Sequence, residues 1–132
     1  MPMKKYKYKT VLLIDDSYID NLISRKILQS SKFAENIIVK DSSQKAVEYI
    51  RESFANGHQI PEIIFLDLRM PDMSGFEFLK TLDTIPELNP EVIKIYVLSS
   101  SLDPKDFQRI KENKLVTNFI GKPLSKEILT EI

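Results

Sequence analysis

The sequence has no cysteine, one histidine, three glycines and no net charge. Without cysteine, disulfides, thiol catalysis and zinc–thiolate sites are excluded, and His58 cannot form a histidine metal cluster alone. Lys+Arg and Asp+Glu both number 19, so the chain lacks the basic surplus that binds nucleic acids and anionic membranes. Composition therefore argues against direct contact with nucleic acid or membrane as the main function.

Long hydrophobic segments are absent too. The start, MPMKKYKYKT, is basic, and the VLLI that follows is too short for a signal peptide or a membrane-spanning helix. The expected location is the cytoplasm. The length of 132 residues is usual for one domain, and 42% hydrophobic with 29% charged residues is typical of a globular chain. Without a repeat or linker, we expect residues 1–132 to form a single domain.

Apolar runs recur at wide, regular intervals and predict five strands. They are TVLLID (10–15), NIIVKD (36–41), EIIFLDL (62–68), VIKIYVLSS (92–100) and LVTNFIG (115–121). We expect the first to begin at Tyr6 or Tyr8. Segments with helical periodicity lie between the strands, so strand and helix alternate five times. This alternation predicts an α/β fold with a parallel sheet and helices on both faces.

Apolar residues at helical spacing predict which face of each helix packs on the sheet. The predicted stripes are Leu22, Ile23, Ile27 and Leu28, then Ala46, Val47, Ile50 and Phe54, then Phe76, Leu79 and Leu82, then Phe107 and Ile110. Asp103 is a candidate N-cap before Pro104, and a last helix follows Ser125. That helix is cut short at Ile132, either because it is short by nature or because a parent chain continues it.

Acids, hydroxyls and a lysine follow four of the predicted strands. They are Asp15 and Asp16 after the first strand, Asp67 after the third, Ser99, Ser100 and Ser101 after the fourth, and Lys122 with Pro123 after the fifth. Ligands of open parallel sheets bind beyond the carboxyl ends of the strands. If the first and third strands are neighbours, three carboxylates meet there and repel each other unless a cation joins them. All-oxygen ligation favours Mg²⁺.

Each of these residues also has an ordinary structural explanation. An acid pair after a strand is often a helix N-cap, and Asp67 could be a turn acid before Pro71. The serines could cap the fourth helix or its loop, and a lysine before a proline is often simply solvated. Chance placement of all four groups at the ligand-binding edge is less expected, so the combination favours a functional site.

Several stretches resemble the receiver domains of two-component response regulators. VLLIDDS is similar to the family's first strand with its acidic pair, IIFLDLRMPDMSGFEFL to the segment around its phospho-acceptor aspartate, IYVLSS to its hydroxyl-bearing strand, and NFIGKPL to its fifth strand and lysine–proline turn. The resemblance covers nearly the whole chain and is of the stand-alone chemotaxis-regulator type. It implies a doubly wound sheet in the flavodoxin-like order 2-1-3-4-5. It also implies a protein that catalyses only its own phosphorylation and dephosphorylation.

The resemblance assigns a role to each matching residue. Asp67 would be the phospho-acceptor. Asp16 would ligate Mg²⁺ directly and Asp15 mostly through water, and the backbone carbonyl of Arg69 would complete the protein ligands. Mn²⁺ is an alternative ion. Lys122 would pair with the phosphoryl oxygens, and the bond between Lys122 and Pro123 would be cis.

Other implied roles concern the response to phosphorylation. Ser99 would hydrogen-bond the phosphoryl group, and the ring of Phe119 would fill the space that Ser99 vacates. This would alter the face made by the fourth helix, fifth strand and fifth helix. Because Phe119 lacks a hydroxyl, burial of its ring must carry the signal. Arg69, Ser100 and Ser101 would modulate loss of the phosphoryl group, and we expect Arg69 to shield it from water.

The partners implied are a histidine kinase or histidine phosphotransfer protein and a downstream protein target; a phosphorylation-linked dimer stays open. Ser43 stands where many receivers have glycine, and we expect it to cap the second helix. A receiver that only docks, without phosphate, is one alternative. An aspartyl-phosphate phosphatase is a second, but it requires an acid at Arg69. A flavodoxin-like nucleotide or flavin binder is a third, but it needs a glycine- or hydroxyl-rich loop where this chain has DDSYID.

Overall fold

Five parallel strands form one sheet in the order β2-β1-β3-β4-β5. The computed structural model describes residues 5–70, 74–100 and 103–132. The strands are β1 (Tyr8–Ile14), β2 (Ala34–Lys40), β3 (Ile63–Asp67), β4 (Lys94–Ser99) and β5 (Val116–Gly121). The helices are α1 (Tyr18–Ser30), α2 (Ser43–Asn56), α3 (Gly75–Leu82), α4 (Pro104–Glu112) and α5 (Lys126–Thr130). The predicted α/β class and strand order are confirmed.

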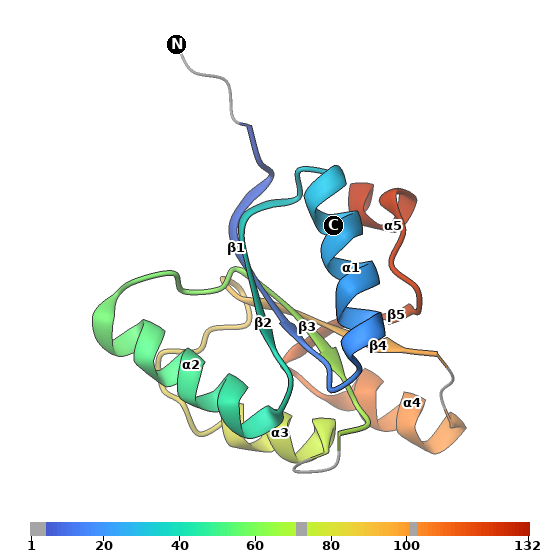
Figure 1. The fold of residues 1–132 in the computed structure, drawn as a ribbon. Helices are drawn as coiled ribbons and strands as arrows, with labels where there is room; N and C mark the ends of the chain where they lie inside the picture. The colour runs from blue at the N-terminus through green and yellow to red at the C-terminus, as the bar shows by residue number, and fades with distance from the viewer. Residues whose placement is uncertain (1–4, 71–73, 101–102) are drawn as a thin grey trace.

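Helices cover both faces of the sheet. Figure 1 shows α1 and α5 together on one face and α2, α3 and α4 on the other. Side chains of a strand alternate between faces, so Leu12 and Ile14 pack with α2 and α3, whereas Val11 and Leu13 pack with α1 and α5. All residues of β3 are buried. Burial on both faces explains why these strands are almost continuously apolar.

The predicted apolar stripe of α1 is confirmed for Leu28, which is buried, and Ile27, which is partly buried against the core, but it is wrong for the first half of the helix. Leu22 and Ile23 are 43% and 44% exposed, and the buried residues of α1 are Asn21, Ser24 and Leu28. The Asn21 side-chain amide donates to the backbone carbonyl of Asp15 at 2.7 Å. This bond holds the Asn21 side chain against the end of β1, whereas Leu22 and Ile23 face outward.

The other helices follow their predicted stripes more closely. Ala46, Val47 and Ile50 of α2 are buried and Phe54 is partly buried, as predicted. In α3, Leu79 and Leu82 are buried, and so is Phe78, which the stripe omitted. In α4 only Ile110 is buried, whereas Phe107 is 41% exposed. The short α4 therefore touches the sheet with a narrow side, and the prediction that Phe107 is a core residue is wrong.

Helix caps agree with the sequence at two of three predicted positions. Asp103 caps α4 with proline in the first turn, and Ser125 caps α5. The cap of α2 is Ser42, whose hydroxyl accepts from the backbone N–H of Lys45. Ser43 is instead fully buried, with its hydroxyl 3.7 Å from the Met70 sulfur. The expectation that Ser43 is the cap is therefore wrong by one residue.

Gly75 allows α3 to begin directly against the end of β3. A Cβ at this position would lie 2.6 Å from Cδ2 and 2.7 Å from Cα of Leu68. The Gly75 backbone N–H donates to the Leu68 carbonyl at 2.9 Å. The absence of a side chain thus sets how closely α3 approaches the strand that carries Asp67. Among the helices of the described residues, none combines the length and apolar character needed to cross a membrane.

Candidate functional site

Three carboxylates meet where β1 and β3 end. These strands are neighbours with Ile14 paired to Leu66, so the residues that follow them are brought together. Asp15, Asp16 and Asp67 each offer a carboxylate oxygen, and these oxygens lie within 4.8 Å of one another. Asp15 and Asp67 are buried and Asp16 is exposed. Such a set of hard oxygen donors, open on one side, fits a divalent cation such as Mg²⁺.

Asp15 is held by two partners. Its Oδ1 accepts from the backbone N–H of Ser17 at 3.0 Å, and its Oδ2 accepts from Lys122 Nζ at 2.6 Å. The Asp15 and Lys122 side chains are only 3% and 15% exposed. Because its oxygens are already engaged while Asp16 faces solvent, Asp16 is the better placed of the pair to take a cation directly.

Asp67 is a buried acid that is costly to ionise. Burial and then the charge of Asp15 raise its pKa from 3.8 to about 6. The Lys122 charge acts in the opposite direction, as does the Arg69 backbone N–H, which donates to Asp67 Oδ1 at 3.4 Å. At neutral pH Asp67 is therefore ionised but insufficiently compensated, and an added positive charge would stabilise it.

Among the described residues, Lys122 is the cation that pairs with Asp15 and Asp67. Its ammonium lies 2.6 Å from Asp15, 2.9 Å from Asp20 and 3.9 Å from Asp67. Burial alone would lower its pKa, but the hydrogen bonds to Asp15 and Asp20 and the nearby negative charges raise it above the usual value. The Lys122 backbone N–H donates to the Ser99 carbonyl at 2.9 Å, and the bond to Pro123 is cis.

Sequence reasoning missed Asp20. The pattern Ser17-x-x-Asp20 is a signal for a helix start, and α1 indeed uses Ser17 as its N-cap. Nothing local indicates that the Asp20 carboxylate contacts Lys122, which is 102 residues away in the chain.

The hydroxyl residues follow β4 at the same edge of the sheet. Ser99 is the last residue of β4 and is 5% exposed. In the paired register Asp67 lies beside Leu98, one residue before Ser99. Ser100 is exposed, and Ser101 lies outside the described residues. The side chain of Arg69, two residues after the buried Asp67, is also exposed.

Phe119 links β5 to α4. It is half-buried, packs with Leu68, Val97 and Ile110, and meets Phe107 edge-on, with 6.1 Å between ring centroids. A Cβ at Gly121 would meet no atom within 4 Å. The space around Gly121 is therefore open, and Phe107 is the distinctive neighbour of this ring.

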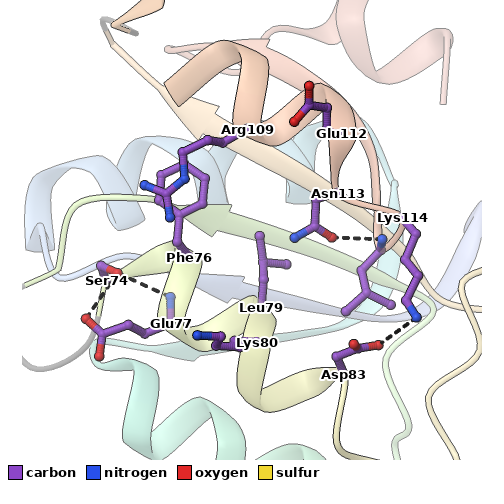
Figure 2. A pocket seen from close by; sticks show the side chains of 11 residues that line it. Ser74, Phe76, Glu77, Leu79, Lys80, Asp83, Arg109, Glu112, Asn113 and Lys114 are labelled. Carbon is purple, nitrogen blue, oxygen red and sulfur yellow. Dashed lines mark hydrogen bonds and ion pairs between the residues drawn. The ribbon is translucent and has the colours of Figure 1, made fainter. Parts of the chain in front are cut away.

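A groove of about 700 Å³ lies between α3 and the end of α4 (Figure 2). The Arg109 guanidinium lies 3.6 Å from the centroid of the Phe76 ring, and Lys114 pairs with Asp83 at 3.3 Å. Both contacts join α3 to the segment that contains α4. The acidic and basic side chains that line the groove are equal in number. Asp15, Asp16 and Asp67 are not among the lining residues.

The fold and the site define the class of protein. It is a flavodoxin-like α/β domain whose strands present three acids, a serine and a lysine at one edge. The model of the response regulator receiver domain matches residues 11–132. The chain therefore belongs to the response regulator receiver family of two-component systems.

Known proteins with similar sequences and structures agree. The two-component response regulator ORR1 of Oryza sativa subsp. japonica is 35% identical over 121 residues, which are 89% of this chain and 51% of that protein. This chain thus spans about half the length of that relative. The crystal structure of a two-component response regulator from Cytophaga hutchinsonii has a TM-score of 0.87 at 30% identity, with 95% and 93% of the two chains covered. A receiver protein from Dyadobacter fermentans has a TM-score of 0.79 at 28% identity, with 93% and 96% covered.

Proposed function

We propose that this receiver accepts a phosphoryl group on Asp67 from a histidine kinase or a histidine phosphotransfer protein. Asp15, Asp16, Asp67 and the backbone carbonyl of Arg69 would hold Mg²⁺, with Mn²⁺ as a substitute. The observation that carries the proposal is the buried Asp67, whose oxygen lies within 4.8 Å of those of two other acids and 3.9 Å from Lys122. Such a cluster serves a nucleophile that must approach an anion.

The proposed transfer uses residues already in place. An Asp67 carboxylate oxygen forms the new bond to phosphorus while the bond between phosphorus and the donor nitrogen breaks, and that nitrogen keeps the electron pair. Bound Mg²⁺ would supply positive charge against the repulsion between carboxylate and donor. Lys122 adds a second positive charge, and the Ser99 hydroxyl can donate a hydrogen bond to a phosphoryl oxygen.

The exposed apolar side of α1 supports a protein as the donor. Tyr18 and Ile19 are 78% and 67% exposed, and Leu22 and Ile23 continue the same side. This surface begins two residues after Asp16, so it borders the acid cluster. Contiguous exposed apolar groups mark contact surfaces, and we propose that the donor packs here while its phosphohistidine reaches Asp67.

The proposed output is a change in the face formed by α4, β5 and α5. If the Ser99 hydroxyl turns toward the phosphoryl group, the Phe119 ring can move into the vacated space, because cores do not tolerate voids. That movement separates the Phe119 ring from Phe107 and biases two arrangements of α4. We further propose that residues 1–132 form one receiver domain whose output is a contact with another protein or with a further domain.

The test is a mass measurement after incubation with acetyl phosphate and Mg²⁺. We expect one phosphoryl adduct on the wild type and none on Asp67→Asn. Absence of the adduct on the wild type would favour a receiver that only docks. An adduct on Asp67→Asn at full yield would place the acceptor elsewhere. Rapid turnover of a large excess of donor would favour a phosphatase, although Arg69 occupies the position where that mechanism needs an acid.

A further inference from the structure

The Lys122 ammonium hydrogen-bonds two acids other than the proposed phospho-acceptor Asp67. It donates to Asp15 and Asp20 at 2.6 and 2.9 Å, whereas Asp67 Oδ2 lies 3.9 Å away, beyond hydrogen-bond distance. If Asp67 is the acceptor, Lys122 must move closer to bind the phosphoryl group, and its hydrogen bonds to Asp15 and Asp20 oppose that movement. Asp15 belongs to the acid cluster, but Asp20 is not among its members.

The cap of α1 explains why Asp20 is available to Lys122. In a capping box, the acid at the third helical position turns back to the backbone N–H of the cap residue. Here the Ser17 N–H donates to Asp15 instead, at 3.0 Å, while the Ser17 hydroxyl accepts from the Asp20 N–H at 3.2 Å. The Asp20 carboxylate is thus released from capping and points to the lysine.

The same position in α3 shows the alternative. Ser74 caps α3, and its hydroxyl accepts from the backbone N–H of Glu77 at 3.2 Å. The Ser74 hydroxyl also donates to the Glu77 carboxylate at 3.3 Å (Figure 2). Glu77 therefore turns back on its own cap, whereas Asp20 reaches across to β5. The two acids form a natural matched pair for comparison.

We propose that Asp20 is a positioning residue that holds the Lys122 ammonium away from Asp67. A phosphoryl group on Asp67 would then replace Asp20 as the partner of this ammonium. The inference rests on the proposed function of Asp67 and Lys122. In the unphosphorylated protein, Asp20 shares the lysine charge and leaves the acids more negative for a cation. After phosphorylation, Asp20 competes with the phosphoryl oxygens for the same ammonium. Asp20 thus lowers the affinity of the site for the phosphoryl group and raises its affinity for the metal ion.

Asp20→Asn should therefore shift two binding constants in opposite directions. Beryllofluoride, a stable mimic of a phosphoryl group on a carboxylate, should bind more tightly at saturating Mg²⁺. Mg²⁺ alone should bind more weakly, because Lys122 then turns toward the acids. Each change should be about three- to five-fold, the size expected for one half-exposed charge pair. A loss of structure would weaken the binding of both ligands. Opposite changes in the two binding constants therefore distinguish a positioning role of Asp20 from a damaged fold.

Calorimetric titration of the full chain with each ligand measures both constants. Glu77→Gln is the matched control and should leave both unchanged, and Asp20→Glu should restore wild-type behaviour. In a Lys122→Met background, Asp20→Asn should have less than about half its effect on the logarithm of either constant, since coupled residues are not additive. Equal effects in both backgrounds, or no effect in the wild type, would overturn the proposal. Failure of the wild type to bind beryllofluoride would instead refute the proposed function.

Discussion

Replacing Asp67 by asparagine should stabilise the protein in the absence of metal. The folded protein raises the pKa of Asp67 from 3.8 to about 6 because the carboxyl is buried beside Asp15, and its side chain is only 11% exposed. Asp67 therefore binds its proton more tightly in the folded than in the unfolded state. The wild type loses stability as the pH rises from about 4 through about 6, and asparagine has no such loss.

The magnitude follows from the two pKa values. Each pKa unit corresponds to about 1.4 kcal/mol, so ionised Asp67 costs about 3 kcal/mol well above pH 6. At pH 5 the same linkage gives roughly half of that cost. The stability difference between Asp67→Asn and the wild type should thus widen by about 1–2 kcal/mol from pH 5 to pH 8. A comparison across pH cancels any packing difference between the two side chains.

Urea unfolding with EDTA, at both pH values, measures this difference. Glu52→Gln, at an exposed position of α2, is the control and should stay within about 0.5 kcal/mol of the wild type. Mg²⁺ at one hundred times its dissociation constant should stabilise the wild type by about 2.7 kcal/mol and Asp67→Asn by less. If the stability difference between Asp67→Asn and the wild type stays constant or narrows between pH 5 and pH 8, burial and the charge of Asp15 do not raise the pKa of Asp67.

Three further predictions concern the surroundings of the site. Gly75→Ala should destabilise the protein by about 1–3 kcal/mol in urea unfolding, because the new Cβ overlaps Leu68; unchanged stability would mean that α3 shifts freely. Arg69→Ala should change the rate at which the phosphoryl group is lost, measured by the decay of the protein adduct, and an unchanged rate would remove the shielding role. Phe107→Ala removes the edge-on partner of Phe119, which is worth about 0.5–1.5 kcal/mol. Beryllofluoride should then bind roughly two- to ten-fold more tightly, and equal or weaker binding would show that Phe107 does not hold the ring outward.

The fold and most of the acid cluster could be predicted because local signals were strong. The run Ile63 to Leu66 is apolar throughout and is buried throughout, which identifies a strand covered on both faces. An acid where such a strand ends must lie at the carboxyl end of the sheet. Pro104 behind Asp103 likewise indicates a helix start, and α4 begins there. In these cases the neighbouring residues in the chain supply the whole physical reason.

Other features depend on partners far away in sequence. Periodicity predicts that α1 is a helix and that Leu28 is buried, but the burial of Asn21 depends on its bond to the Asp15 carbonyl at the end of β1. The exposed Phe107 could not be inferred, because Phe119, its ring partner, lies on another element.

The sequence by itself determined the strands, the helices, the strand order expected for the family and the set of acids at one edge. Only the tertiary structure decided that Lys122 hydrogen-bonds Asp15 and Asp20 while Asp67 lies farther from its ammonium, at 3.9 Å. The physical reason is that backbone propensity and apolar periodicity are local, whereas an ammonium selects its partner by distance and burial. The distances and the burial of the Lys122 ammonium are fixed only when the folded chain has placed β5 beside β4 and the start of α1 next to the end of β1.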